Sequence, residues 1–142
     1  MKTVRELLEG KGGSVHAIAP GARVYEALEL MAAKEIGALL VIEEGRLAGI
    51  ISERDYARKV ILHGKSSQEI AVRDIMTTRL VTVRPSQSVD ECMALVTDHR
   101  IRHLPVMEGG RLIGVVSIGD LVKAVIEDQR ETIKQLESYI HS

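Results

Sequence analysis

The chain has 142 residues, 45% of them hydrophobic, and a formal net charge of −1. This length allows one domain, or two very small ones that share a core, and the near-zero charge argues against bulk attraction to nucleic acid or to an anionic membrane. Trp and Phe are absent, so few aromatic faces could stack on single-stranded bases. Cys92 is the only cysteine, which excludes an internal disulfide and a cysteine cluster for zinc.

The amino terminus, "MKTVRELLEG", carries charges where a secretory signal needs an apolar run. No apolar stretch approaches the ~20 residues of a membrane span, so we expect a cytoplasmic protein. The segment "VRELLEGKGGS" predicts a short helix that is ended by glycines. Its "GKGGS" lacks the residue spacing of a phosphate-binding P-loop, and we interpret it as a flexible loop.

An internal repeat organises the rest of the chain. Shifting the sequence by 65 positions aligns residues 15–60 with residues 80–125 without a gap, and 15 of the 46 positions are identical. The clearest match sets "GRLAGIISERD" (Gly45–Asp55) against "GRLIGVVSIGD" (Gly110–Asp120). The sequence therefore predicts two copies of one unit. Because such a unit buries little surface alone, we expect the copies to pack together with pseudo-two-fold symmetry.

Each copy predicts the order β-α-β-β-α, an α/β fold of the mixed α+β kind. A short strand ("VHAI" or "LVTV") precedes a proline, which disfavours helix just before it. An amphipathic helix follows, and the pair Ser88 and Glu91 predicts a capping box at the second of these helices. Two apolar runs separated by "EEG" or "EGG" then predict a strand–turn–strand that is buried on both faces. The last helix begins at Ser52 or Ser117.

These elements divide the chain into five expected segments. They are an amino-terminal helix and loop (1–14), a first domain (15–64), a linker with a short helix near Val72–Met76 (65–79), a second domain (80–125) and a carboxy-terminal helix extension (126–142).

The repeat resembles the CBS-domain pair, also called a Bateman module. The resemblance rests on "DIMT" (Asp74–Thr77), "GALLVIEEGRLAGIISERD" (Gly37–Asp55) and "RHLPVMEGGRLIGVVSIGDLVKAV" (Arg102–Val125), and it covers residues 15–125. It implies that a stand-alone pair binds an adenine nucleotide between its copies: AMP, ADP, ATP or, as a further candidate, NAD(H). In that family a Ser/Thr-x-x-Asp motif reaches the ligand, and its Asp holds the ribose hydroxyls.

Ser52 with Asp55, and Ser117 with Asp120, match this motif. A carboxylate can accept hydrogen bonds from both hydroxyls of a diol, and such charge-assisted bonds are strong. The helix that starts there offers free backbone N–H groups to a phosphate. The alternative interpretation is that Ser-x-x-Asp only caps a helix.

The resemblance also implies further nucleotide contacts. In the second copy, Arg102 and His103 form a basic pair for phosphate, where the first copy has Gly37 and Ala38. Arg54 is expected to compensate in the first copy, and Gly119 stands at its place in the second. The remaining expected contacts, mostly for adenine, are Ile18, Ala19, Ile36 and Ile50 from the first copy and Val83, Arg84, Ile101 and Val115 from the second.

Other features favour structural interpretations. His99 and His103 have a metal-like spacing, but the helix should end before "IRHLPV", so we expect no metal. Arg54, Arg58 and Lys59 are interpreted as a solvated face, and Cys92 as a small core hydrophobe. No nucleophile–base arrangement stands out, so we expect a protein that is not an enzyme and has no catalytic cofactor.

The leading hypothesis is a regulatory module whose packing or partner affinity changes when an adenine nucleotide binds. The alternative is a dimeric interaction module that regulates a partner enzyme, for example a thioredoxin-type protein, with ligand binding secondary. A homodimer is expected because the last helix carries a heptad-like apolar stripe: Val122, Ile126, Gln129, Ile133, Leu136 and Ile140. The stripe could instead pack on its own domain near Val4, Leu7 and Leu8.

Overall fold

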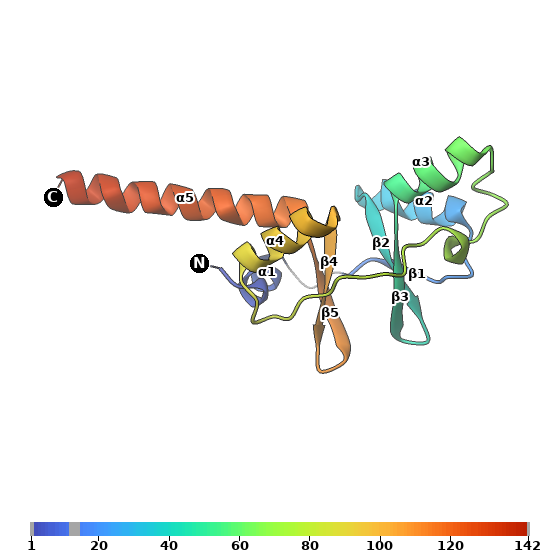
Figure 1. Ribbon diagram of the computed structural model, residues 1–142, viewed down its shortest axis with the longest axis horizontal. Helices are drawn as coiled ribbons and strands as arrows, with labels where there is room; N and C mark the ends of the chain where they lie inside the picture. Colours follow the sequence, from blue (N-terminus) through green and yellow to red (C-terminus); the bar gives the residue numbers. More distant parts are fainter. Residues whose placement is uncertain (1, 12–14, 142) are drawn as a thin grey trace. The chain divides into compact units, whose positions relative to one another are not determined.

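The two repeats fold into two separate units in the computed structural model, which describes residues 2–11 and 15–141 (Figure 1). The first-repeat unit contains residues 15–80. The second-repeat unit contains residues 81–141 together with the amino-terminal residues 2–11, which lie before the first repeat in the sequence. The structure confirms the predicted fold class, a mixed α+β fold with two repeats.

The first-repeat unit is a three-stranded sheet with helices. Strand order is β1-β2-β3, with β1 parallel to β2 and β2 antiparallel to β3. Its elements are β1 (Ala17–Ile18), α2 (Val24–Lys34), β2 (Ala38–Glu43), β3 (Arg46–Ser52), α3 (Glu53–Lys59) and the 3-10 turns η1 (Ile61–His63) and η2 (Val72–Asp74).

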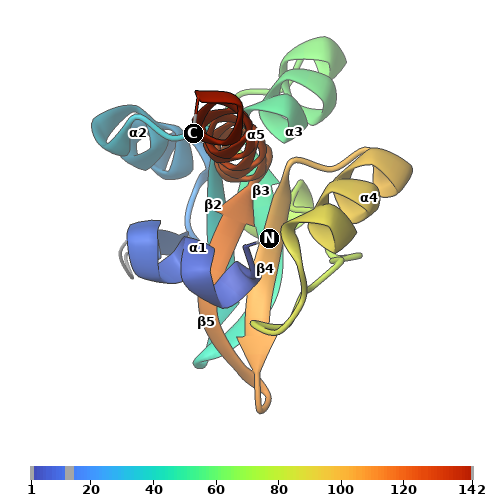
Figure 2. The ribbon, with the colours of Figure 1, turned by 90° about the vertical axis from the view of Figure 1, so that its left-hand side faces the viewer.

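The second-repeat unit is built around one hairpin and ends in a long helix. Its elements are α1 (Val4–Lys11), α4 (Val89–His99), β4 (His103–Glu108), β5 (Arg111–Ser117) and α5 (Ile118–His141). Helix α1 packs against β5, and α4 packs against β4 and α5 (Figure 2). The predicted loop at "GKGGS" begins later than expected, because α1 continues through Gly10 and Lys11; residues 12–14 of that loop lie outside the described part of the chain.

The two hairpins have the same register. Ser52 stands opposite Ala38, and Ser117 stands opposite His103, with a bulge at the same place in both hairpins. Each tight turn has two consecutive residues with positive φ, Glu44–Gly45 and Gly109–Gly110, which is the backbone that a two-residue hairpin turn requires. The matching register fixes both Ser-x-x-Asp motifs at equivalent positions.

The first strand of the second repeat is shorter than predicted, and Pro105 explains why. In the first repeat the Leu40 N–H donates to the His16 carbonyl at 3.1 Å. The residue equivalent to Leu40 is Pro105, which has no N–H to donate. The predicted strand "LVTV" is therefore reduced to one parallel bridge, between Val83 and Val106.

The segment that precedes each repeat packs on the other repeat. Residues 2–5 bond to the second repeat through the same three backbone hydrogen bonds that residues 70–73 make to the first. The bonds are Val4 N to Gln87 O, Arg5 N to Pro85 O and Val89 N to Lys2 O in one unit, and Val72 N to Ala22 O, Arg73 N to Pro20 O and Val24 N to Ile70 O in the other. The two segments are thus structural equivalents, offset by 68 positions.

Each unit buries its own aliphatic core. The largest buried side chains include Met31, Leu39 and Ile51 in the first-repeat unit and Leu104 and Leu121 in the second. Cys92 belongs to the second core, and burial raises the pKa of its thiol to about 11. The thiol is therefore protonated near neutral pH and packs as a small hydrophobe.

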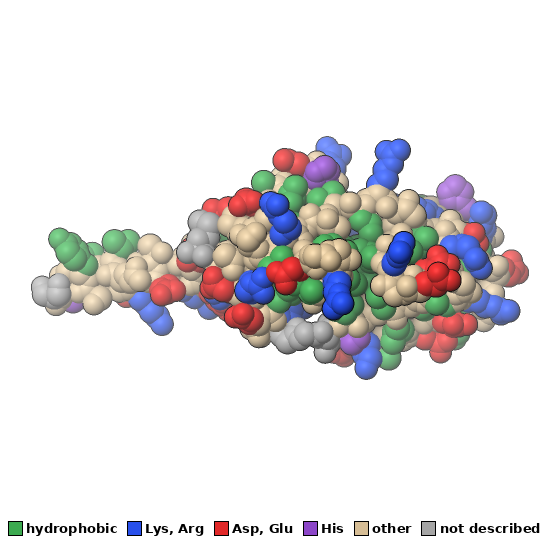
Figure 3. Space-filling model, turned by 90° about the horizontal axis from the view of Figure 1, so that it is seen from below, with side chains coloured by type: hydrophobic (Ala, Val, Ile, Leu, Met, Phe, Trp, Pro, Cys, Tyr) green, Lys and Arg blue, Asp and Glu red, His purple; other side chains and the backbone are tan. Residues whose placement is uncertain are grey.

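Helix α5 uses only its first turns to cover this core. Leu121 and Ala124 are buried, but the stripe side chains further along are exposed: Ile133 by 54%, Leu136 by 58% and Ile140 by 73%. Hydrophobic side chains are visible on the part of α5 that extends beyond the rest of its unit (Figure 3). The stripe therefore does not pack on its own domain, and α1 takes the place against β5 through Leu8 and its neighbours.

The equivalent glycines Gly49 and Gly114 allow a matched test of this packing. A Cβ atom at Gly49 would lie 2.7 Å from the backbone oxygen of Thr77, whereas one at Gly114 would lie 2.7 Å from a terminal methyl of Leu8. Because a leucine tip moves more easily than a paired backbone, we expect Gly49→Ala to lower the free energy of unfolding by about 2 kcal/mol and Gly114→Ala by about 1 kcal/mol or less. Chemical denaturation measures both, and equal or reversed losses would contradict this packing.

Candidate functional site

Both Ser-x-x-Asp motifs fold as helix starts. Ser52 caps α3: its hydroxyl accepts from the Asp55 N–H at 3.1 Å, and Asp55 Oδ2 accepts from the Ser52 N–H at 3.0 Å and from its hydroxyl at 3.0 Å. Ser117 does the same at α5, where the Asp120 N–H donates to its hydroxyl at 3.1 Å and the Ser117 N–H donates to Asp120 Oδ2 at 2.8 Å. The capping role is therefore present at both motifs, and it engages the Oδ2 atom of each carboxylate.

Asp55 uses its second oxygen as well. Thr77 donates its hydroxyl to Asp55 Oδ1 at 3.3 Å, and the Lys59 ammonium lies 3.0 Å from the same atom. A carboxylate has about four lone-pair sites. With two donors on Oδ2, and the Thr77 hydroxyl and the Lys59 ammonium at Oδ1, both oxygens of Asp55 are engaged within its own unit.

Asp120 receives its described donors differently, because two of them share Oδ2. Lys11 of α1 donates to Asp120 Oδ2 at 2.7 Å, in addition to the Ser117 N–H, and the same ammonium donates to the Val115 carbonyl at 2.9 Å. In residues 2–11 and 15–141, the hydrogen bonds from the Lys11 ammonium and the Ser117 N–H both fall on Oδ2. The Asp120 side chain keeps 26% of its surface exposed, so the carboxylate remains partly accessible to a ligand.

The environment of Asp120 favours its ionised form. Burial alone would raise the pKa of this carboxyl, but the hydrogen bonds from Lys11 and Ser117 and the charge of Lys11 together outweigh burial, and the pKa lies below its ordinary value. Asp120 is therefore a carboxylate near neutral pH, the form that accepts strong hydrogen bonds from hydroxyl groups.

The expected basic pair lies beside Ser117. His103 is directly opposite Ser117 in the hairpin, and the Ile118 N–H donates to the Arg102 carbonyl at 2.8 Å. Burial, together with the charges of Lys11 and Arg102, lowers the pKa of His103, although Asp120 opposes the shift. His103 is thus a neutral hydrogen-bonding group near pH 7, and Arg102 supplies the charge of the pair.

The other expected contacts divide between the units. In the first-repeat unit, the half-buried ones are Ile18, Ile36 and Ala38, the exposed ones are Ala19, Gly37 and Arg54, and the buried one is Ile50. In the second-repeat unit, the exposed ones are Arg84 and Gly119, and the half-buried ones are Ile101 and Val115. Val83 is the least accessible of these residues to a ligand, because its side chain is buried and its N–H and carbonyl both form hydrogen bonds with β4.

Three residues that contact these carboxylates were not predicted from the sequence: Thr77, Lys59 and Lys11. Thr77 lies in the quoted "DIMT", and Lys59 follows Asp55 by four residues, a spacing at which helical ion pairs form. Lys11 gave no such signal, because it belongs to a segment outside the repeat.

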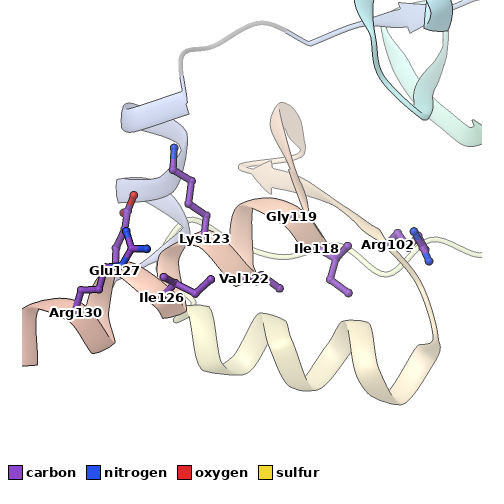
Figure 4. Close-up of a pocket in the computed structure, with 8 residues that line it drawn as sticks. All are labelled: Arg102, Ile118, Gly119, Val122, Lys123, Ile126, Glu127 and Arg130. Carbon is purple, nitrogen blue, oxygen red and sulfur yellow. The ribbon is translucent and has the colours of Figure 1, made fainter. Parts of the chain in front are cut away.

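A groove continues from this region along α5. It has a volume of about 640 Å³ and is lined by Arg102, Ile118, Gly119, Val122, Lys123, Ile126, Glu127 and Arg130. Ile118, Val122 and Ile126 form its apolar row, and Lys123, Glu127 and Arg130 lie beside them (Figure 4).

The metal-like histidine spacing does not produce a helical pair. Helix α4 ends at His99, Arg100 takes the left-handed conformation that terminates it, and His103 begins β4. Among the described residues, no helix combines the length and hydrophobicity that crossing a membrane requires.

Comparisons with known proteins give one consistent result. The CBS-domain family model matches residues 13–62 and 72–127. The chain is 43% identical over 147 residues to the CBS domain-containing protein CBSX3, mitochondrial, of Arabidopsis thaliana, covering 97% of this chain and 71% of that protein. A putative signal-transduction protein with CBS domains from Burkholderia ambifaria superposes with a TM-score of 0.87 at 53% identity, over 90% of this chain and 96% of that one.

A more distant structure shows the same fold. It is the CBS domain pair of protein MJ0100 in complex with 5'-methylthioadenosine and S-adenosyl-L-methionine, with a TM-score of 0.79 at 22% identity, over 90% of this chain and 98% of that one. The repeat, the fold and the family match agree, and the chain belongs to the CBS-domain proteins as a tandem CBS-domain pair.

Proposed function

We propose that this CBS-domain pair is a regulatory module that binds an adenine nucleotide through its Ser-x-x-Asp motifs, with AMP as the representative ligand. The observation that carries the proposal is the ionised, partly exposed Asp120 carboxylate, which the Ser117 N–H fixes at the start of α5 through Oδ2. A ribose diol presents two hydroxyl donors that suit such an acceptor. Binding then changes packing or the affinity for a partner.

The surroundings of Asp120 fit the rest of a nucleotide. The positive end of the α5 dipole and the Arg102 side chain supply positive potential for a phosphate. The MJ0100 pair, which contains two adenosine compounds, supports an adenosine moiety as the recognised part. ADP, ATP and NAD(H) share this moiety with AMP and are ligands of the same class.

A partner enzyme is the second candidate function. CBS-domain proteins are generally regulatory, and the exposed stripe of α5 supports a role in interaction. A thioredoxin-type enzyme is the partner class we expect in that case. We retain the cytoplasm as the proposed location, with an organelle as the alternative, because the Arabidopsis relative is named mitochondrial.

We further propose that the stripe of α5 pairs with the stripe of a second copy. Lys123, Arg130 and Glu137 follow one edge of the stripe at seven-residue spacing. In an antiparallel helix pair, this edge of one helix lies against the same edge of the other helix. Glu137 of one copy then lies near Lys123 or Arg130 of the other copy. A parallel pair gives no such match of opposite charges. The antiparallel order also places Leu136 and Ile140 of one copy at the groove beside Val122 and Ile126 of the other.

The first test replaces the proposed ribose ligand. Asp120→Ala should weaken AMP binding by about thirty- to a hundredfold, because a pair of charge-assisted hydrogen bonds is lost. Asp120→Asn, which can still accept from the Ser117 N–H, separates this effect from loss of the helix cap. Calorimetric titration measures both variants, and Asp128→Ala on the exposed part of α5 is the matched control. Unchanged AMP affinity in both variants, with a lower melting temperature in Asp120→Ala, would leave Asp120 as a capping residue only.

A second test addresses the dimer. The full chain should sediment as a dimer at micromolar concentration, and Leu136→Asp should make it a monomer, because a charge would be buried in the apolar seam. Gln135→Asp, one residue away and off the stripe, should remain dimeric. A monomeric unaltered chain would refute the dimer, whereas a dimeric Leu136→Asp variant would show that the stripe has no part in it.

A further inference from the structure

Lys11 occupies the second-repeat site in a way that the first-repeat site does not share. In the first-repeat unit, Thr77 donates two hydrogen bonds: its N–H donates to the Ile50 carbonyl at 2.8 Å, and its hydroxyl donates to Asp55. Ile50 and Asp55 are equivalent to Val115 and Asp120. The Lys11 ammonium alone bonds to both of these equivalents. One cationic group therefore does in one unit what a neutral residue does in the other.

The origin of this difference is the amino-terminal segment. The segments before the repeats correspond up to Met76 and Leu8, which lie against Gly49 and Gly114 respectively. Beyond that point the first-repeat unit has an extended residue, Thr77, whereas α1 continues as helix for another turn and ends at Lys11. The cation at Asp55 is Lys59, but its equivalent in the second repeat is the buried Ala124. Asp120 thus receives its cation from outside the repeat.

The Lys11–Asp120 pair is available for exchange. Their side chains are 33% and 26% exposed, and an ion pair with this exposure changes an equilibrium constant by at most about fivefold. Ser117 and Lys11 together fill Asp120 Oδ2, so a diol that binds both carboxylate oxygens must displace the ammonium. A ligand that offers Lys11 another anionic acceptor offsets the free energy lost when the ion pair breaks.

A phosphate is such an acceptor, and it is expected on the side where Lys11 already acts. This side contains Arg102, His103 and the start of α5. The charge of Lys11 helps to lower the pKa of His103 there. We propose, resting on the nucleotide-binding function above, that Lys11 is a specificity-determining residue that makes the Asp120 site prefer a 5'-phosphorylated nucleoside to the free nucleoside. The ammonium moves from Asp120 to the phosphate when the diol takes the carboxylate.

The test compares AMP with adenosine on the full chain. The amide signal of Gly119, beside Asp120, is followed by NMR so that the affinity belongs to this site. The unaltered chain should prefer AMP, and Lys11→Met should reduce the AMP-to-adenosine affinity ratio by about tenfold, mainly through weaker AMP binding. Lys11→Gln should behave like Lys11→Met, and Lys11→Arg should keep the ratio within about threefold.

Lys2→Met is the matched control, because Lys2 precedes the same helix and forms an ion pair with Glu127 away from Asp120. Its ratio should equal that of the unaltered chain. An unchanged ratio in Lys11→Met, or an equal fall in Lys2→Met, would overturn the assignment of Lys11 while leaving nucleotide binding intact. If neither AMP nor adenosine shifts Gly119 at millimolar concentration, the proposed function itself fails, and the Lys11 assignment fails with it.

Discussion

The hydrogen bond from the serine N–H to Oδ2 of the following aspartate fixes both candidate sites. It joins the end of a hairpin strand to the first turn of a helix, at Ser52–Asp55 and at Ser117–Asp120. Because the two hairpins share one register, the bond places each carboxylate at the same point of its unit. Helix capping and ligand binding are compatible here, since the cap engages Oδ2 and leaves Oδ1 for other donors.

The two units then diverge in what reaches Oδ1 and Oδ2. Thr77 and Lys59 complete the acceptor capacity of Asp55, whereas Lys11 adds a second donor to the Oδ2 atom that the cap already uses at Asp120. Thr77 and Lys11 both come from the segments that precede the repeats, which pack on the opposite repeat through equivalent backbone bonds. Two copies that share one hairpin register therefore present carboxylates with different surroundings to a ligand.

Much of the fold could be predicted from the sequence because many residues are identical in the two repeats. The hairpins, both serine helix starts and the exposed stripe of α5 follow from periodicity, Gly positions and the Ser-x-x-Asp spacing. The shortening of the first strand of the second repeat could also be predicted from the sequence, since Pro105, which has no N–H to donate, stands where the first repeat has Leu40. The sequence does not reveal where α1 packs: its residues differ from those of the linker, and only backbone hydrogen bonds show that residues 2–5 and 70–73 are equivalent. Lys11 was missed for this reason.

Because the described donors of Asp120 share Oδ2, whereas Asp55 also has Thr77 and Lys59 at Oδ1, we expect the second-repeat site to bind AMP more tightly. A protein-observed NMR titration of the unaltered chain with AMP tests it most directly, with the amide of Gly119 reporting on Asp120 and that of Arg54, at the equivalent position, reporting on Asp55. The amide of Gly119 should saturate first, at an AMP concentration at least about tenfold lower than the amide of Arg54. Simultaneous saturation of the two amides, or earlier saturation of Arg54, would contradict it.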